Sequence, residues 1–179
     1  MKVAFRTFGC QMNINDTEAM MGVLSKAGHE IVANEEDAEA VIVNTCAVRA
    51  KSEDKLYGKL GQLKAMKRRK GRLLVGVCGC VAEKNATELL THKEVDFVFG
   101  TRAITRVDEL LKRAELGERF IEMGDFIDEL DSDTPRVRTS SHHAWITIIF
   151  GCDKFCSYCI VPYTRGREKS RNMNDILSE

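Results

Sequence analysis

Short apolar runs alternate with amphipathic segments through residues 1–123 of the chain. Residues 41–46 and 73–78 are almost continuously apolar, which is typical of parallel strands buried on both faces. Shorter strands are predicted at residues 3–8, 30–33, 96–99 and 120–123, the last of them at a sheet edge.

Four stretches between these runs repeat apolar residues with the period of a helix. The predicted helices cover residues 15–27, 52–70, 82–92 and 104–114. The first is expected to begin at Asn15, because Asn15 and Glu18 have the spacing of a capping box. Gly28 and Gly71 follow two of the helices as stop signals. Strands that alternate with helices predict an α/β fold with an open parallel sheet flanked by helices.

The pattern changes after residue 123, where the first predicted domain, residues 1–123, ends. Residues 124–141 form a predicted linker that is rich in acidic side chains. A second domain is predicted over residues 142–179, with a first strand at 144–150, a loop at 152–171 and the start of a helix at 174–179.

The composition excludes several classes of protein but does not itself indicate a function. The 179 residues are 44% apolar and 30% charged, which excludes a disordered or fibrous protein. The 27 basic and 27 acidic residues cancel, so total charge gives no argument for a nucleic-acid partner, and any such argument must be local. No apolar run approaches the roughly 20 residues of a membrane span, and residues 1–13 lack secretory-signal features. We therefore expect a cytoplasmic protein with no membrane contact.

The cysteines carry the candidate chemistry. Seven of them in a chain expected to be cytoplasmic favour metal ligation over disulfides. Cys152, Cys156 and Cys159 follow the predicted strand with C-x3-C-x2-C spacing. Three thiolates suit zinc or an iron–sulfur cluster. Structural zinc needs a fourth ligand, for which His142 and His143 are candidates, so a zinc knuckle or unligated thiols are the alternatives to a four-iron cluster with one open iron.

Three further cysteines each follow a predicted strand. Cys10, Cys46 and Cys80 stand at the ends of the first, third and fourth strands. Because ligands bind beyond the carboxyl ends of parallel strands, these cysteines are predicted to converge as a second cluster site. Unligated core packing is the alternative, since buried cysteines are common. Cys78, two residues before Cys80, is predicted to pack in the core, with ligation as its alternative.

These motifs resemble the radical S-adenosylmethionine (SAM) methylthiotransferase family. Residues 7–13 (TFGCQMN), 44–49 (NTCAVR) and 79–80 are similar to its amino-terminal domain. Residues 151–168 (GCDKFCSYCIVPYTRGRE) resemble its radical-SAM motif. The tripeptide at residues 11–13 is similar to that of the branch that methylthiolates C2 of N6-isopentenyladenosine beside the tRNA anticodon.

The resemblance implies two 4Fe–4S clusters. Cys152, Cys156 and Cys159 would hold the cluster that binds SAM and cleaves it reductively to a 5′-deoxyadenosyl radical, and Tyr158 would lie near the adenine. Cys10, Cys46 and Cys80 would hold the cluster that presents the transferred sulfur. The implied partners are the tRNA anticodon loop and an electron donor, and we expect a monomer. The alternatives are a methylthiotransferase acting on threonylcarbamoyladenosine or a ribosomal-protein aspartate, or a non-catalytic metal-binding module.

The family also has a full (β/α) barrel and an RNA-binding domain. Residues 142–179 correspond only to the first strand and cluster loop of that barrel, so we expect a truncated chain that is inactive alone. Residues 136–171 carry seven Lys or Arg against two Asp or Glu. Four of these basic residues follow the cysteine loop, where they could meet phosphates or simply be solvated: Arg165, Arg167, Lys169 and Arg171.

Overall fold

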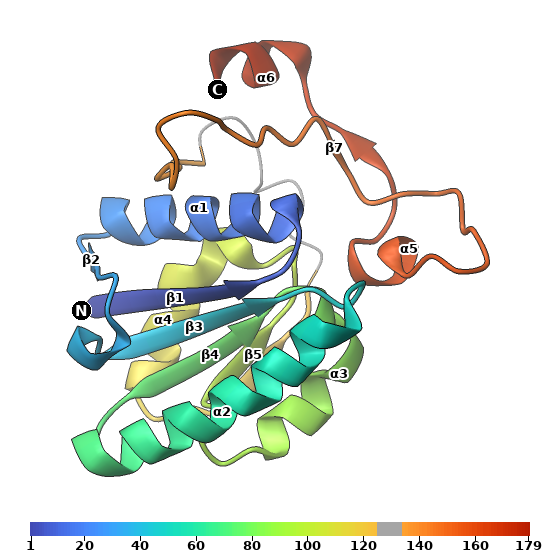
Figure 1. The fold of residues 1–179 in the computed structure, drawn as a ribbon. Coiled ribbons are helices and arrows are strands. Elements are labelled where there is room, and N and C mark those ends of the chain that lie inside the picture. The colour runs from blue at the N-terminus through green and yellow to red at the C-terminus, as the bar shows by residue number, and fades with distance from the viewer. Residues whose placement is uncertain (125–133) are drawn as a thin grey trace.

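The structure, a computed structural model, describes residues 1–124 and 134–179, apart from the side chain of residue 50. Most of the predicted linker, residues 125–133, lies outside the described residues. Six strands form one sheet in the order β2-β1-β3-β4-β5-β6, and every neighbouring pair is parallel. The strands are β1 (Lys2–Phe8), β2 (Glu30–Ile31), β3 (Ala40–Thr45), β4 (Leu74–Cys78), β5 (Phe97–Phe99) and β6 (Phe120–Glu122). The predicted open parallel sheet is confirmed, with residues 120–122 at its edge (Figure 1).

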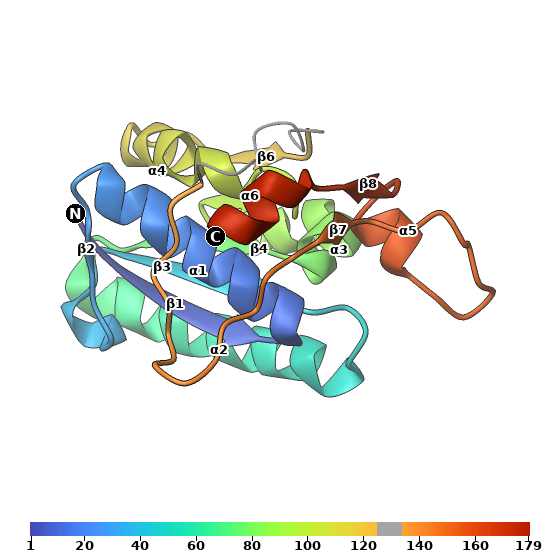
Figure 2. The ribbon, with the colours of Figure 1, turned by 90° about the horizontal axis from the view of Figure 1, so that it is seen from above.

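Helices cover both faces of this sheet. They are α1 (Gln11–Lys26), α2 (Ala50–Lys70), α3 (Cys80–Thr91) and α4 (Val107–Glu115), with short 3-10 turns η1 (Glu35–Asp37) and η2 (Ile104–Arg106). Helices α1 and α4 lie on one face, and α2 and α3 lie on the other (Figures 1 and 2). No helix within the described ranges is long and apolar enough to cross a bilayer.

The central strands are buried on both sides, as their continuous apolar runs predicted. Successive side chains of a strand point to opposite faces. Ile42 of β3 therefore packs in the cluster that contains Met20 of α1 and Leu110 of α4. Its neighbour Val43 packs in the opposite cluster with Leu60 of α2.

Three helices begin earlier than the sequence pattern predicted, among them α2, which begins at Ala50 rather than at residue 52. Helix α1 begins at Gln11 because Cys10 is its N-cap, with the Cys10 N–H donating to Asn13 Oδ1 at 3.4 Å. Asn15 and Glu18, the predicted capping pair, are instead buried inside the helix, so that prediction was wrong. Helix α3 begins at Cys80 rather than at residue 82, because Gly79 takes the N-cap position.

The remaining elements lie beside the sheet: β7 (Ile149–Phe150), α5 (Val161–Thr164), β8 (Lys169–Ser170) and α6 (Met173–Ser178). The strand predicted at 144–150 forms only at its last two residues, which pair antiparallel with β8. The predicted loop at 152–171 likewise contains α5 and β8. A strand needs a hydrogen-bonded partner, and among the described residues only this short ribbon supplies one. Trp145, Ile146 and Ile148 are accordingly exposed, and the start of a barrel stays a prediction.

Candidate metal centre

Three cysteines come together at the carboxyl edge of the sheet. Cys10 follows β1, Cys46 follows β3 and Cys80 opens the helix after β4. β1, β3 and β4 are neighbours, and the strand order reverses at the β1–β3 pair, where ligands bind in open α/β sheets. The Cys46 N–H donates to the Phe8 carbonyl at 2.9 Å and ties the first two strand ends together.

The three thiols are close enough to affect one another. Burial raises the pKa of the Cys46 thiol, and the nearby Cys10 and Cys80 sulfurs raise it further. All three thiols are free, and Cys46 and Cys80 are buried. Within residues 1–124 and 134–179, however, no three His, Cys, Asp or Glu side chains are gathered tightly enough to hold a metal ion. The donor set suits a soft metal or an iron–sulfur cluster, and the assignment of these cysteines as ligands stays a prediction.

A buried amide pair holds the first two strand ends in place. Asn13 Nδ2 donates to Asn44 Oδ1 at 2.9 Å, and Asn44 Nδ2 donates back to the Asn13 carbonyl at 2.9 Å. Asn44 Nδ2 also lies 3.1 Å from Thr17 Oγ1. These amides satisfy one another away from water, which fixes the turns that carry Cys10 and Cys46.

This role of Asn13 and Asn44 was not predicted from the sequence. An asparagine inside an otherwise apolar strand, as at Asn44, was the available signal.

The turn before Cys80 requires a glycine. Gly79 has a φ of 93°, in the left-handed region that L residues avoid. A Cβ there would lie 2.6 Å from the Thr45 carbonyl oxygen and closer still to Asn44 Oδ1. The β4–α3 connection can therefore pack against the end of β3 only because residue 79 has no side chain.

Cys78 is fully buried in the hydrophobic core, among aromatic side chains such as Phe97 and Phe99. Burial raises the pKa of its thiol well above the usual value, and the neighbouring Asp16 carboxylate acts in the same direction. The chain turns into α3 directly after Gly79, so Cys78 and Cys80 do not continue one extended strand. This position agrees with the predicted packing role of Cys78.

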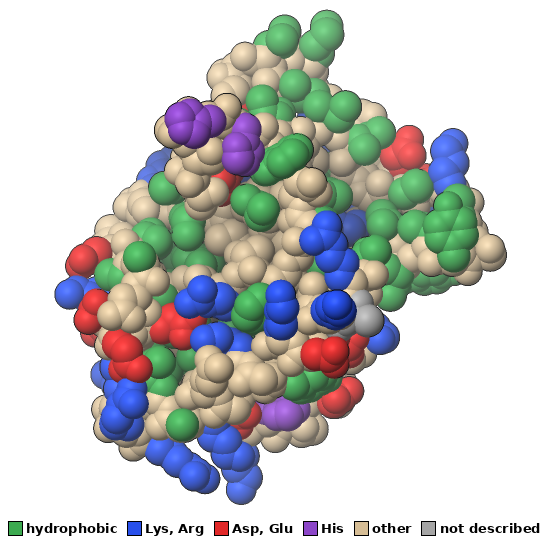
Figure 3. Space-filling model, viewed as in Figure 1, with side chains coloured by type: hydrophobic (Ala, Val, Ile, Leu, Met, Phe, Trp, Pro, Cys, Tyr) green, Lys and Arg blue, Asp and Glu red, His purple; other side chains and the backbone are tan. Residues whose placement is uncertain are grey.

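The second cysteine group lies on a surface loop. Cys156 is exposed, and Cys152 and Cys159 are half-buried. A turn brings the last two together, with the Cys159 N–H donating to the Cys156 carbonyl at 2.9 Å. Tyr158, predicted to lie near the SAM adenine, is 91% exposed. Hydrophobic side chains gather on this projecting part of the surface (Figure 3), so the loop is open to a ligand.

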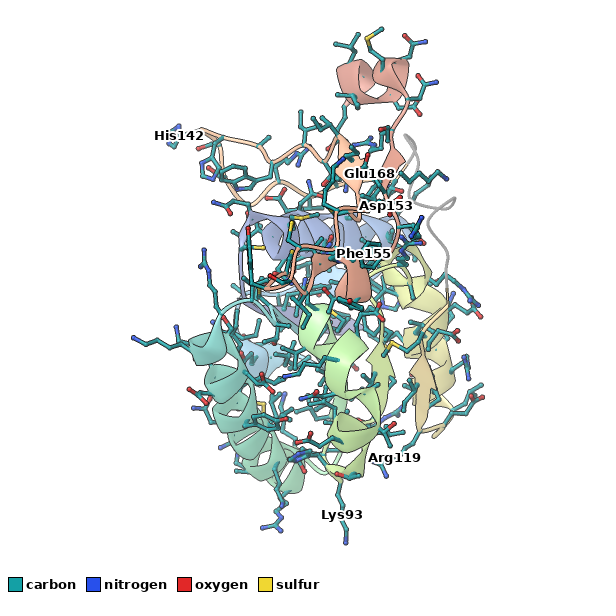
Figure 4. All side chains as sticks on the ribbon, turned by 90° about the vertical axis from the view of Figure 1, so that its right-hand side faces the viewer. Lys93, Arg119, His142, Asp153, Phe155 and Glu168 are labelled. Carbon is teal, nitrogen blue, oxygen red and sulfur yellow. The ribbon has the colours of Figure 1, made fainter. Side chains whose placement is uncertain are left out.

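The two histidines considered as zinc ligands lie on a separate exposed loop. His143 Nδ1 is 3.0 Å from Ser140 Oγ, and its ring packs edge-on against Trp145. His142 points away from the loop that carries Asp153 and Phe155 (Figure 4). Neither histidine joins the cysteines in a metal-binding group among the described side chains.

Two of the four basic residues after the loop are neither solvated nor free for phosphates. Arg165 and Arg171 are buried in ion pairs, with Asp16 at 2.7 Å and with Glu179 at 2.6 Å. Burial would lower the pKa of the Arg165 guanidinium, but the Asp16 carboxylate and the Cys80 sulfur raise it above its usual value. Arg167 remains exposed. Both interpretations of this basic run were therefore wrong for Arg165 and Arg171.

Comparison with known proteins agrees with these motifs. Residues 2–100 match the family described as "Uncharacterized protein family UPF0004". A tRNA-2-methylthio-N(6)-dimethylallyladenosine synthase from Thermotoga petrophila is 56% identical over 179 residues, which is 100% of this chain and 40% of that protein. Proteins of the same name from Petrotoga mobilis and Halalkalibacterium halodurans are 51% and 43% identical, over 100% and 99% of this chain and 41% and 34% of their own lengths.

The chain thus spans about 40% of the length of the most similar of these relatives. It belongs to the uncharacterized protein family UPF0004, and relatives similar along its whole length confirm its resemblance to the methylthiotransferases.

Proposed function

We propose that the protein to which this chain belongs methylthiolates C2 of N6-isopentenyladenosine beside the tRNA anticodon. The observation that carries this proposal is the arrangement of six cysteines in two groups. One group lies at the carboxyl edge of the sheet, and the other lies on the adjacent open loop. The names of the relatives support the same reaction and substrate.

Each group suits one 4Fe–4S cluster. We assign Cys10, Cys46 and Cys80 to the first, and Cys152, Cys156 and Cys159 to the second, which would also bind SAM. When bound, the two clusters and SAM would supply the one-electron reduction, the radical formed from SAM and the sulfur that is transferred. A radical is needed because an adenine C2–H is too weak an acid for a side chain to deprotonate.

The chain's own residues shape the two sites differently. Cys46 and Cys80 are buried, which would shield the sulfur-bearing site from water. Tyr158 is exposed beside the open loop and is available to stack on an adenine ring. Arg167, exposed on the same segment, is the basic side chain we propose to meet an RNA phosphate.

An anticodon loop is a suitable substrate because its single-stranded bases can be splayed into a pocket. We propose that the enzyme acts in the cytoplasm as a monomer with an external electron donor. Because the relatives are longer than this chain, we also propose that residues 1–179 do not turn over alone.

Iron counting tests the cluster assignment. After anaerobic reconstitution, the chain should hold about eight irons, as two four-iron clusters require. Replacing Cys10, Cys46 and Cys80 by Ala should remove about four of them, and replacing Cys152, Cys156 and Cys159 should remove the other four. Cys78→Ala is the matched control and should leave the iron content per chain unchanged. Unchanged iron in either triple variant would refute the assignment of that group, and zinc in place of iron would support the non-catalytic alternative.

Activity requires the full-length protein. Incubation with SAM, a reductant and isopentenylated tRNA should give the 2-methylthio nucleoside, detected by mass spectrometry of the digested tRNA. Product formed by residues 1–179 alone would contradict the proposed need for the rest of the protein.

A further inference from the structure

Residues 164–167, which follow the second cysteine group, are fastened to the α/β domain by their backbone. Thr101 Oγ1 donates to the Thr164 carbonyl at 2.8 Å in a buried contact. Arg102 donates from Nε and Nη2 to the Arg165 carbonyl at 3.1 and 2.9 Å, and from Nη2 to the Arg167 carbonyl at 3.0 Å. Thr101 and Arg102 follow β5, so this attachment is to the edge of the sheet that carries the first cysteine group.

The attachment reaches the second cysteine group directly. The Cys152 N–H donates to the Gly166 carbonyl at 3.1 Å. Gly151 packs so closely on the backbone of residues 166–167 that a Cβ would collide with it. A shift of residues 164–167 would therefore also move Cys152.

The Arg165 side chain enters the domain from this segment. Its Nη1 and Nη2 lie 3.2 and 2.7 Å from the two carboxylate oxygens of Asp16, and the two side chains are only 6% and 8% exposed. The Cys80 side chain lies close enough to this guanidinium to interact with it. Asp16 belongs to α1, whose N-cap is Cys10. One guanidinium thus connects helix α1, a cysteine of the first group and the segment that holds the second.

We propose that Arg165, fixed by Asp16, is a positioning residue that sets the placement of the two cysteine groups relative to each other. This inference rests on the proposed function, in which sulfur from one group must meet the carbon activated at the other. Reacting atoms must lie about 3–3.5 Å apart for such a transfer, so a small displacement of one group is costly. A planar, two-pronged guanidinium suits this role better than a point charge.

Arg165→Lys tests the proposal, because it keeps the positive charge but loses the two-pronged contact. In the full-length protein loaded with iron, sulfide and SAM, the iron content should be unchanged. The amount of methylthiolated nucleoside formed per SAM cleaved should fall about 10–100-fold, the scale expected for a misplacement near 1 Å. Asp16→Asn, which keeps the size of the side chain, should lower the same ratio.

The matched control is Arg72→Lys. Arg72 pairs with Glu115 at 3.3 Å on the surface, just before the amino end of β4 and thus at the opposite end of this strand from Cys80. It should leave both the iron content and the product ratio unchanged.

A measurement without metal tests the attachment itself. In residues 1–179, Arg165→Lys and Asp16→Asn should speed hydrogen exchange at the Cys152 and Arg165 amides at least tenfold, measured by NMR. The amides of β3 should stay protected relative to an unfolded chain, which shows that the domain is still folded.

An unchanged product ratio in Arg165→Lys would overturn the positioning role. So would loss of iron in step with loss of product, because Arg165 would then only support ligand binding. The two proposals can also fail separately. If the full-length wild type makes no methylthiolated nucleoside, the proposed function is refuted. Faster exchange at the Cys152 amide in the variants would still support the attachment through Arg165.

Discussion

Gly79 shows how a single residue controls the carboxyl edge of the sheet. It combines a φ of 93° with a position against Asn44 and Thr45 at the end of β3. Its neighbour Cys80 can reach the other cysteines only through this turn. Gly61, in contrast, lies inside α2, where a Cβ would meet open space beyond the backbone of its own helix.

Gly79→Ala should destabilise the chain by roughly 2–4 kcal/mol, because it adds backbone strain to a steric collision. Gly61→Ala should stabilise it by up to about 1 kcal/mol, since alanine is the better helix former. Urea unfolding followed by circular dichroism measures both. Equal effects of the two substitutions would contradict the role given to Gly79.

Glu35 carries a pH dependence that can be followed at one site. Its carboxylate forms ion pairs with Arg6 at 2.7 Å and with Lys59 at 3.1 Å. Burial alone would raise the pKa of its carboxyl, but these two cations outweigh burial and hold the pKa below its usual value. A lowered pKa in the folded state means that the ionised form stabilises the protein above the unfolded pKa of about 4.3.

This stabilisation should disappear as the pH falls from about 5 through the folded pKa of Glu35. The unfolding free energies of wild type and Glu35→Gln should therefore differ at pH 7 and converge in acid. Glu36→Gln is the control, because its pair with Arg69 is exposed and should contribute less than about 1 kcal/mol. A difference for Glu35→Gln that is constant with pH would rule out the ionic origin.

Among the elements, helix α4 shows how a periodic pattern becomes packing. Its apolar residues lie on one face and are buried against the sheet: Val107, Leu110, Leu111 and Ala114. The charged residues Asp108 and Lys112, one turn apart, pair at 2.7 Å near the surface. This division was readable from the sequence because apolar residues recurred every three to four positions.

Leu111→Ala should cost about 2–5 kcal/mol, because it opens a cavity under a helix that covers the sheet. Leu116→Ala makes the same chemical change one residue beyond α4, at a side chain that is 82% exposed, and should cost less than about 0.5 kcal/mol. Thermal unfolding of the two variants measures the difference. Similar losses would mean that α4 does not pack as described.

At the scale of the whole molecule, the two edges of the sheet have different roles. The amino ends of the strands lie toward Lys93 and Arg119, at the end of the molecule away from Asp153, Phe155 and Glu168 (Figure 4). The carboxyl edge holds the three cysteines and receives residues 164–167. Residues 135–139 pack along helix α1, where they contact Gly22 and donate hydrogen bonds to Glu18. The predicted domain boundary near residue 123 can be tested against this arrangement.

A chain ending at Gly124 should still unfold cooperatively, because both hydrophobic clusters of the sheet are complete before that residue apart from Phe150. It would, however, leave Asp16 without Arg165. Asp16→Asn should therefore destabilise the 179-residue chain by about 3–5 kcal/mol but be neutral or stabilising in the shorter chain. Denaturant titration of wild type and Asp16→Asn, each in the 179-residue chain and in the chain ending at Gly124, measures these differences. A shorter chain that does not fold would place the domain boundary elsewhere.

The sequence by itself determined the class of fold and the order in which its strands and helices follow one another along the chain. Residues 41–46 and 73–78 had the continuous apolar pattern that suits buried parallel strands, and α2 and α4 had clear helical periods, because burial imposes these patterns locally. It also located the two groups of cysteines, since one has a short fixed spacing and the other follows strand ends.

The tertiary structure alone decided the contacts between distant residues. Asn13 pairs with Asn44 and Asp16 pairs with Arg165 across 31 and 149 positions, and no local period encodes such partners. It also placed the start of α1 at Gln11 and buried two arginines that were expected either to meet phosphates or to be solvated. Local propensity depends on neighbours along the chain, whereas ion pairs and buried amides depend on which strand ends the completed sheet brings side by side.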